Sequence, residues 1–145
     1  EGMWLDTGAR AIHRAPDTSA RLVSRSVVQG RAVSVFRGTD YVSPEAKGAK
    51  AHVECSTLLL SPEAKTETIP VLRAENDEVE LGHEATVGRV SQEQLFYLMS
   101  RGITEEDAQF MIINGFCRGV FQELPFEFAM EASQLLRVSL EGTVG

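Results

Sequence analysis

The strongest constraint on this chain is a change of hydrophobic period between residues 78 and 102. Apolar residues at positions 79, 81, 85 and 87 share one parity, which is typical of a strand with one buried face. Beyond it, Leu95, Phe96, Leu98 and Met99 recur at helical spacing. Ser91 and Gln94 between them are placed for a capping box, and Gly102 is placed for a helix C-terminus. A β-region therefore ends near residue 90, and a helical region follows it.

The β-region reads as strands separated by turns, at 21–28, 31–36, 51–60, 66–72 and 78–87. The first, third and fifth strands start about 30 residues apart, with the other two between them. No helix and no tight hairpin turn intervenes, which favours a flattened parallel β-helix with two strands per turn. An antiparallel sandwich fits the periodicity nearly as well. The pentapeptide SPEAK occurs at Ser43–Lys47 and at Ser61–Lys65, which predicts two equivalent loops.

The C-terminal region predicts helices at about 92–101, 105–114 and 126–140. Thr104 is a second cap signal, Gly115 and Gly119 are expected to break the second helix, and Pro125 opens the third. The expected organisation is a partial β-helix core over 1–90 and a helical domain over 91–145. An apolar stripe in the helical domain predicts a surface for a partner protein, formed by Phe110, Ile113, Phe116 and Phe121. The alternative is that all four residues pack inside the chain.

The candidate chemistry centres on Cys55, which shares a strand face with Val53 and Thr57. The simplest interpretation is an inert buried thiol. His83 and Glu84 follow Cys55 by 28 and 29 residues, so a coil near that length would place them one rung away. Regular parity would stack His83 on Cys55, whereas a shift of one residue would align Glu84. Such a group could ligate iron or zinc, with His52 as a further ligand, or form a Cys–His nucleophile.

Charge and motif content exclude several classes of function. The net charge of −7 argues against a nucleic acid or an anionic membrane as partner. Two cysteines are too few for a disulfide framework, which favours a reducing compartment. The sequence has no phosphate-binding glycine loop, no GxSxG motif and no HExxH motif. ATPase or hydrolase chemistry is therefore not expected from this chain.

Several stretches together resemble the C-terminal part of the SufB/SufD family of iron–sulfur cluster assembly proteins. They are HVECSTLLL, HEATVGRVSQEQLFYLMSRGITEEDAQFMIINGF, LPFEFAMEASQLL and the SLEGTVG end. The FCRGVF and PFEFAMEA segments favour the B-type over its D-type paralogue. The resemblance implies a right-handed parallel β-helix followed by a small helical domain, mainly β with α. It also implies a longer parent chain, of which this would be roughly the last third.

The resemblance implies a scaffold and not an enzyme. Family members form a complex with a SufD-like paralogue, or a self-dimer, and with an ABC-type ATPase (SufC-like), and they receive sulfur from a cysteine desulfurase or sulfur carrier. Cys55 would hold sulfur or a transient iron–sulfur cluster, with Glu84 as a further metal ligand and His83 beside it. Reduced flavin in the full complex and a cytoplasmic or plastid-stromal location are also implied.

Two residues depart from the family pattern. Ser56 stands where the family usually has aspartate, and Gly82 stands where some members have an acid. Two competing interpretations remain, a structural interaction platform with Cys55 buried and a thiol enzyme that uses Cys55 and His83.

Overall fold

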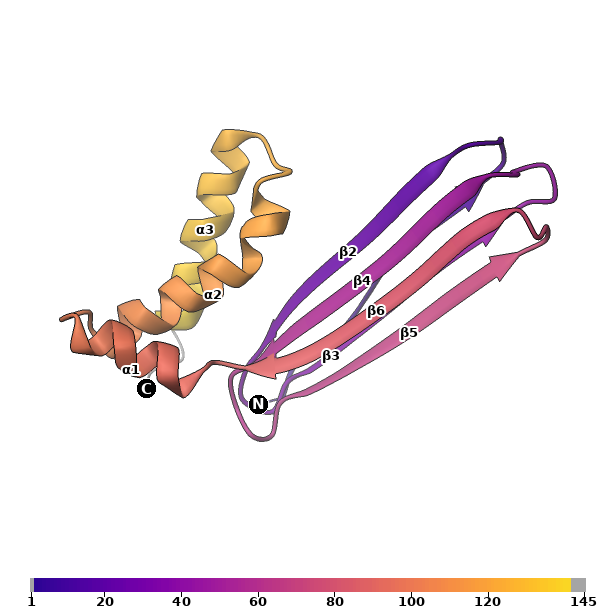
Figure 1. Cartoon of the computed structure of the whole chain (residues 1–145). Helices are drawn as coiled ribbons and strands as arrows, with labels where there is room; N and C mark the ends of the chain where they lie inside the picture. The colour runs from indigo at the N-terminus through magenta and orange to yellow at the C-terminus, as the bar shows by residue number, and fades with distance from the viewer. Residues whose placement is uncertain (1, 142–145) are drawn as a thin grey trace. The chain divides into compact units, whose positions relative to one another are not determined.

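The computed structural model describes residues 2–141, and the chain divides into two compact units, Glu1–Gly88 and Arg89–Gly145. The first unit is formed by strands and the second mainly by helices (Figure 1). Among the described residues, no helix has both the length and the apolar character that a bilayer-spanning segment requires. Each unit is described separately below.

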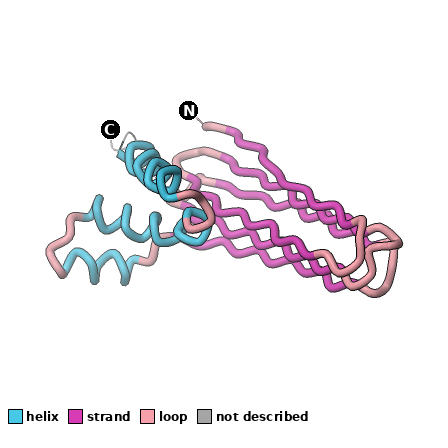
Figure 2. The backbone as a smooth tube through the Cα atoms, turned by 90° about the horizontal axis from the view of Figure 1, so that it is seen from above, coloured by secondary structure: helices cyan, strands magenta, loops and turns pink. Residues whose placement is uncertain are grey.

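The first unit contains six strands that form two three-stranded sheets, in the orders β1-β3-β5 and β2-β4-β6. Consecutive strands alternate between the sheets, and loops at the ends of the unit connect them (Figure 2). The strand bounds are β1 Trp4–His13, β2 Ser19–Val28, β3 Val33–Val42, β4 Ala49–Leu59, β5 Lys65–Ala74 and β6 Val79–Arg89.

Strand pairing in these sheets is parallel. Trp4 pairs with Val33, Ser19 with Lys50 and Val33 with Lys65, so each coil takes about 30 residues. This register confirms the predicted coil of two strands and excludes the antiparallel sandwich. The right-handed sense of the coil stays a prediction.

Strand β1 was not predicted from the sequence, and β3 is longer than the predicted strand at 31–36. Strand β1, WLDTGARAIH, is almost entirely exposed, so its apolar and polar residues need not alternate. It lies at the edge of its sheet, where only β3 pairs with it. A strand without a buried face leaves little periodic signal in the sequence.

The interior of the first unit comes mainly from alternate positions of the middle strands. On β4, Ala51, Val53, Cys55 and Thr57 are buried, while the residues between them are more exposed. We call this buried side the inner face and the opposite side the outer face. Gly38 on β3 lies against Val53, so the two sheets approach closely at this point.

The two SPEAK segments form equivalent turns, as predicted. In the first, the Ala46 amide donates to the Ser43 carbonyl at 3.2 Å, and in the second the Ala64 amide donates to the Ser61 carbonyl at 3.3 Å. Both alanines are buried. The repeat therefore encodes a coil corner that returns a small apolar side chain to the interior.

The second unit contains α1 Gln92–Ser100, α2 Glu105–Phe121 and α3 Phe126–Glu141. The Ser91 and Thr104 hydroxyls accept from the Gln94 and Asp107 amides at 3.3 and 3.2 Å, which confirms both predicted N-caps. Gly102 ends the first helical segment with a positive φ of 85°.

The predicted break in α2 is wrong. The helix continues through Gly115 and Gly119 to Phe121. A helical glycine costs about 1 kcal/mol relative to alanine. Buried Ile113 and Cys117 anchor the helix on either side of Gly115, so tertiary packing outweighs this cost.

Candidate functional site

Cys55 lies on the inner face of β4 with only 4% of its surface exposed. Its register partner on β2 is Ser24. Burial raises the pKa of the Cys55 thiol, Glu54 raises it further, and Arg25 opposes them. The thiol of this chain is therefore protonated at neutral pH and is a poor nucleophile in this conformation.

Strand β6 is aligned with β4 by side-chain contacts along its length. Lys50 pairs with Glu80 at 2.8 Å, and Thr86 Oγ1 donates to Ser56 Oγ at 3.0 Å. A Cβ added to Gly82 would lie 2.7 Å from His52 Nδ1. Each of these contacts joins a residue of β4 to the residue 30 positions later on β6. The same register places Ala85 beside Cys55.

The predicted stacking of His83 on Cys55 is therefore wrong, and so is the alternative alignment of Glu84. The reason lies in the corner between β5 and β6, where the Asn76 side chain accepts from the Glu78 amide at 3.0 Å. Asn76 also donates to the Ser43 carbonyl of the preceding coil at 2.9 Å. Residue parity in the strands cannot reveal how many residues such a corner consumes.

The two candidate ligands on β6 fall on different faces. Glu84 has the parity of Glu80, Gly82 and Thr86, whose partners are on the outer face, whereas Cys55 faces inward. His83 has the parity of the inner face and is aligned with Val53, one step from Cys55. Both His83 and Glu84 are exposed. In this conformation His83, and not Glu84, shares the face of Cys55.

The described residues hold no cluster of three His, Cys, Asp or Glu side chains that could bind a metal ion. Cys55 is a soft thiol ligand and the one cysteine of the first unit, while Cys117 is buried in α2 of the second unit. His52 has the outer-face parity and lies over Gly82. Within the first unit, Cys55 is therefore the one thiol that could bind a soft metal.

A polar network that sequence reasoning missed covers the outer face next to Cys55. We call it the outer clamp, formed by Arg21, Arg25, Glu54, Ser56 and Thr86. Arg25 donates to both Glu54 and Ser56, and Arg21 donates to the second Glu54 oxygen at 2.6 Å. These hydrogen bonds hold the pKa of Glu54 below its usual range, with Arg25 the larger cause. The only sequence signal is the like parity of Arg21 and Arg25 on one strand.

The apolar stripe predicted to bind a partner is split by the structure of the second unit. Ile113 is fully buried, so it is a core residue of the helical unit. Phe110, Phe116 and Phe121 are partly buried. Phe110 and Phe121 line a groove of about 690 Å³ between α2 and α3, together with Phe126 and Met130.

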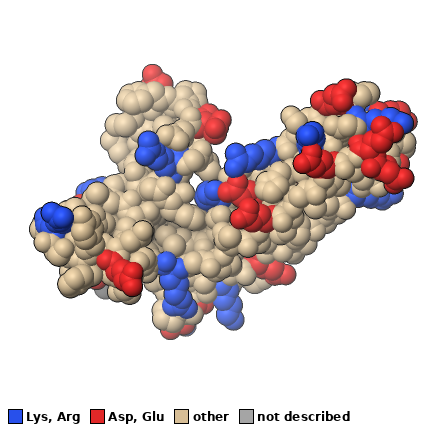
Figure 3. All heavy atoms as spheres, viewed as in Figure 1, with Lys and Arg blue, Asp and Glu red and all other residues tan. Residues whose placement is uncertain are grey.

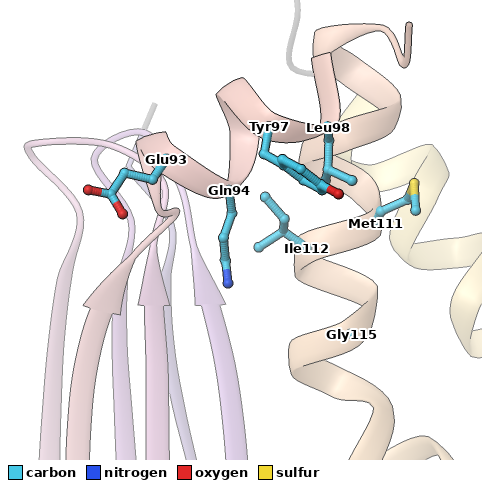
Figure 4. A pocket seen from close by; sticks show the side chains of 7 residues that line it. All are labelled: Glu93, Gln94, Tyr97, Leu98, Met111, Ile112 and Gly115. Carbon is cyan, nitrogen blue, oxygen red and sulfur yellow. The ribbon is translucent and has the colours of Figure 1, made fainter. Parts of the chain in front are cut away.

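Exposed apolar side chains that the sequence reading did not single out also lie on the helices. Phe96 on α1 and Phe126 on α3 are each 75% exposed. A second pocket, of about 510 Å³, lies between α1 and α2, where Tyr97 and Leu98 approach Met111 and Ile112 (Figure 4). On the face of the helical unit shown in the space-filling view, acidic and basic residues form separate patches with uncharged surface between them (Figure 3).

Comparison with known proteins identifies the family. Residues 1–116 match the family model described as the SufBD core domain of SUF system FeS cluster assembly. The chain belongs to the SufBD family. It is 45% identical over 145 residues to an iron–sulfur cluster assembly SufBD family protein of Staphylococcus aureus strain USA300. It is 46% identical over 145 residues to one of Staphylococcus saprophyticus.

Both SufBD relatives are longer than this chain. The match covers 100% of the chain but 31% of each relative, so the chain spans about a third of their length. The matched core includes Cys55, His83 and Glu84 and ends within α2. The outer clamp also lies inside the matched SufBD core, whereas α3 lies beyond it.

Proposed function

We propose that this chain is part of an iron–sulfur cluster assembly scaffold that holds sulfur or iron at Cys55. The observation that carries the proposal is the position of Cys55, a buried thiol on the middle strand of a sheet in a SufBD-family core. A thiolate binds sulfur and iron better than any other group near it. The cluster is cargo, which the scaffold must later release.

A single thiol suits this task when a second chain supplies the remaining ligands. Strand β6 is an edge strand beside Cys55, and its residues His83 to Arg89 are exposed. An exposed edge is a ready surface for another chain. We propose that a SufD-like paralogue, or a second copy of the same subunit, approaches here and completes the ligand set around Cys55, with sulfur from a cysteine desulfurase and reduced flavin as electron source.

The experiment is anaerobic reconstitution of the full-length complex with iron and sulfide, with the cluster measured by visible absorbance. Cys55→Ser should abolish cluster formation. His83→Ala should impair it more than Glu84→Ala, because His83 shares the inner-face parity of Cys55. A Cys55→Ser complex that still forms a normal amount of cluster would contradict the proposal.

The second candidate is a structural platform in which the solenoid only joins subunits. Its support is the burial of Cys55 and the raised pKa of its thiol. It predicts that Cys55 resists alkylation in the assembled complex even while ATP is hydrolysed. A scaffold, in contrast, must expose the thiol at some stage of cluster assembly. The interpretation as a thiol enzyme has less support, because His83 is not aligned with Cys55. Hydrolysis of an ester or amide by this chain alone would support it.

We propose that the groove between α2 and α3 binds an ABC-type ATPase (SufC-like), which supplies the ATP hydrolysis. The groove is apolar, and Phe121 on its wall is only partly buried. Phe121→Asp should weaken binding of the ATPase, measured by calorimetry, while Phe96→Asp on α1 serves as the matched control. Unchanged affinity for Phe121→Asp would reject this surface. A cytoplasmic or plastid-stromal location agrees with such partners and stays a prediction.

A further inference from the structure

Arg25 contacts both chain neighbours of Cys55. Its Nη2 donates to Glu54 Oε1, and its Nη1 donates to Ser56 Oγ at 2.9 Å. The side chains of Arg25 and Glu54 are only 19% and 17% exposed, so water screens this pair less than a surface pair. The planar guanidinium is suited to two directed hydrogen bonds, which a lysine ammonium at the same position cannot reproduce.

The outer clamp continues from β4 to the edge strand. Ser56 Oγ accepts from Arg25 and also from Thr86 Oγ1, at 3.0 Å. An ion pair also joins β4 to β6, between Lys50 and Glu80, whose side chains are 69% and 73% exposed. An exposed pair of that kind stabilises little. The Ser56–Thr86 hydrogen bond is therefore the side-chain tie between β4 and β6 that lies next to Cys55.

The position of Cys55 depends on its neighbours because alternate residues of a strand face opposite sides. Holding Glu54 and Ser56 on the outer face holds Cys55 on the inner face, and a slip of one residue would reverse all three. The tie to Thr86 also fixes the β6 segment that carries His83 and Ala85 relative to Cys55. We propose that Arg25 is a positioning residue, which holds Cys55 and the facing segment of β6 in the arrangement that receives the cluster.

This inference rests on the proposed function for its effect on cluster formation, but its effect on the thiol can be measured separately. The test uses the full-length subunit in its complex, with variants Arg25→Lys, Thr86→Val and Thr86→Ser. Arg37→Lys is the matched control, because Arg37 makes a two-pronged contact with Asp6 on the other sheet. The readouts are the rate of Cys55 alkylation by iodoacetamide at one pH and the visible circular dichroism of the reconstituted cluster.

Arg25→Lys and Thr86→Val should each speed Cys55 alkylation by about tenfold. Arg25→Lys weakens the hydrogen bonds that hold the two chain neighbours of Cys55, and Thr86→Val removes the hydrogen bond that ties β6 to β4 beside the thiol. Both should also alter the circular dichroism of the cluster. Thr86→Ser keeps the hydroxyl and should restore wild-type behaviour, and Arg37→Lys should match wild type. Because Thr86 is exposed, its variants keep the test decisive if Arg25→Lys fails to assemble.

Two results would overturn the proposal. One is wild-type alkylation in both Arg25→Lys and Thr86→Val. The other is equal behaviour of Thr86→Ser and Thr86→Val, which would show that the hydroxyl plays no part. A cluster that survives Cys55→Ser would instead reject the proposed function, and the alkylation rates would still decide the role of Arg25.

Discussion

Gly38 offers a quantitative test of how closely the two sheets of the solenoid pack. A Cβ at position 38 would lie 2.8 Å from Val53 Cγ1 and 3.3 Å from Phe36 Cε1. Carbon atoms in contact prefer about 3.5–4.0 Å, so Gly38→Ala forces a shift of roughly 1 Å. Val53 is fully buried, and a β-branched side chain has little freedom at χ1. A small side-chain movement therefore cannot relieve the clash.

The expected magnitudes follow from these contacts. Overpacking of this kind costs about 1–3 kcal/mol, and the lower backbone entropy of alanine in the unfolded chain offsets about 0.5–1 kcal/mol of it. Gly38→Ala should thus lower the free energy of unfolding by about 1–2 kcal/mol. Val53→Ala removes two buried methyl groups and leaves a cavity, which should cost about 2–3 kcal/mol.

In the double variant, the new methyl group at position 38 partly fills the cavity at position 53. The two losses should therefore fall short of additivity by about 1–2 kcal/mol. The assay is equilibrium urea unfolding followed by far-ultraviolet circular dichroism, with the slopes compared across the variants. Gly82→Ala is the matched control, because its clash is with the exposed, movable His52 ring and should cost less than about 0.5 kcal/mol. Additivity within about 0.5 kcal/mol would refute the reasoning.

Two further predictions concern stability. Asp40 is fully buried, neither carboxylate oxygen has a hydrogen-bond partner among the described residues, and burial raises its pKa while His13 opposes the shift. The stability linked to a raised carboxyl pKa is present below the unfolded value of about 3.9 and is lost as pH rises through the folded value. Asp40→Asn should therefore stabilise the chain by about 1–2 kcal/mol at neutral pH. It should also make the free energy of unfolding depend less on pH in the acidic range, as urea titrations at several pH values would show. An unchanged pH dependence would contradict the burial argument. Ser91→Ala removes the N-cap of α1 and should cost about 1 kcal/mol, while Ser91→Asp should keep the stability in the same unfolding assay.

The fold could be predicted from the sequence because its determinants are local or periodic. The alternation around Cys55 marks one buried face of β4, and strands that return at a nearly constant interval without helices indicate a coil. Ser91 and Thr104 mark the helix N-termini, because each hydroxyl accepts a hydrogen bond from the backbone amide three residues later. These signals act within a few residues, so the linear order of the chain preserves them.

The candidate site could be predicted only in part. The residue types of Cys55, His83 and Glu84 were visible, but their alignment depends on the number of residues in a corner held by Asn76 and the preceding coil. The contact of Arg25 with both Glu54 and Ser56 joins strands that are a full coil apart in sequence. No local pattern indicates which of many arginines meets which of many carboxylates across that distance.

The sequence by itself indicated most of the strands and helices and which residues of β4 face inward, because those choices follow from hydrophobic period and capping. The almost entirely exposed β1 and the continuation of α2 through two glycines left no such signal. The tertiary structure alone decided that Ala85 lies beside Cys55 and that Ile113 is buried in the helical unit. The register between successive coils depends on how many residues each corner contains. The burial of a residue depends on which other element covers its face. Both are properties of contacts between distant residues, so they exist only once the chain has folded.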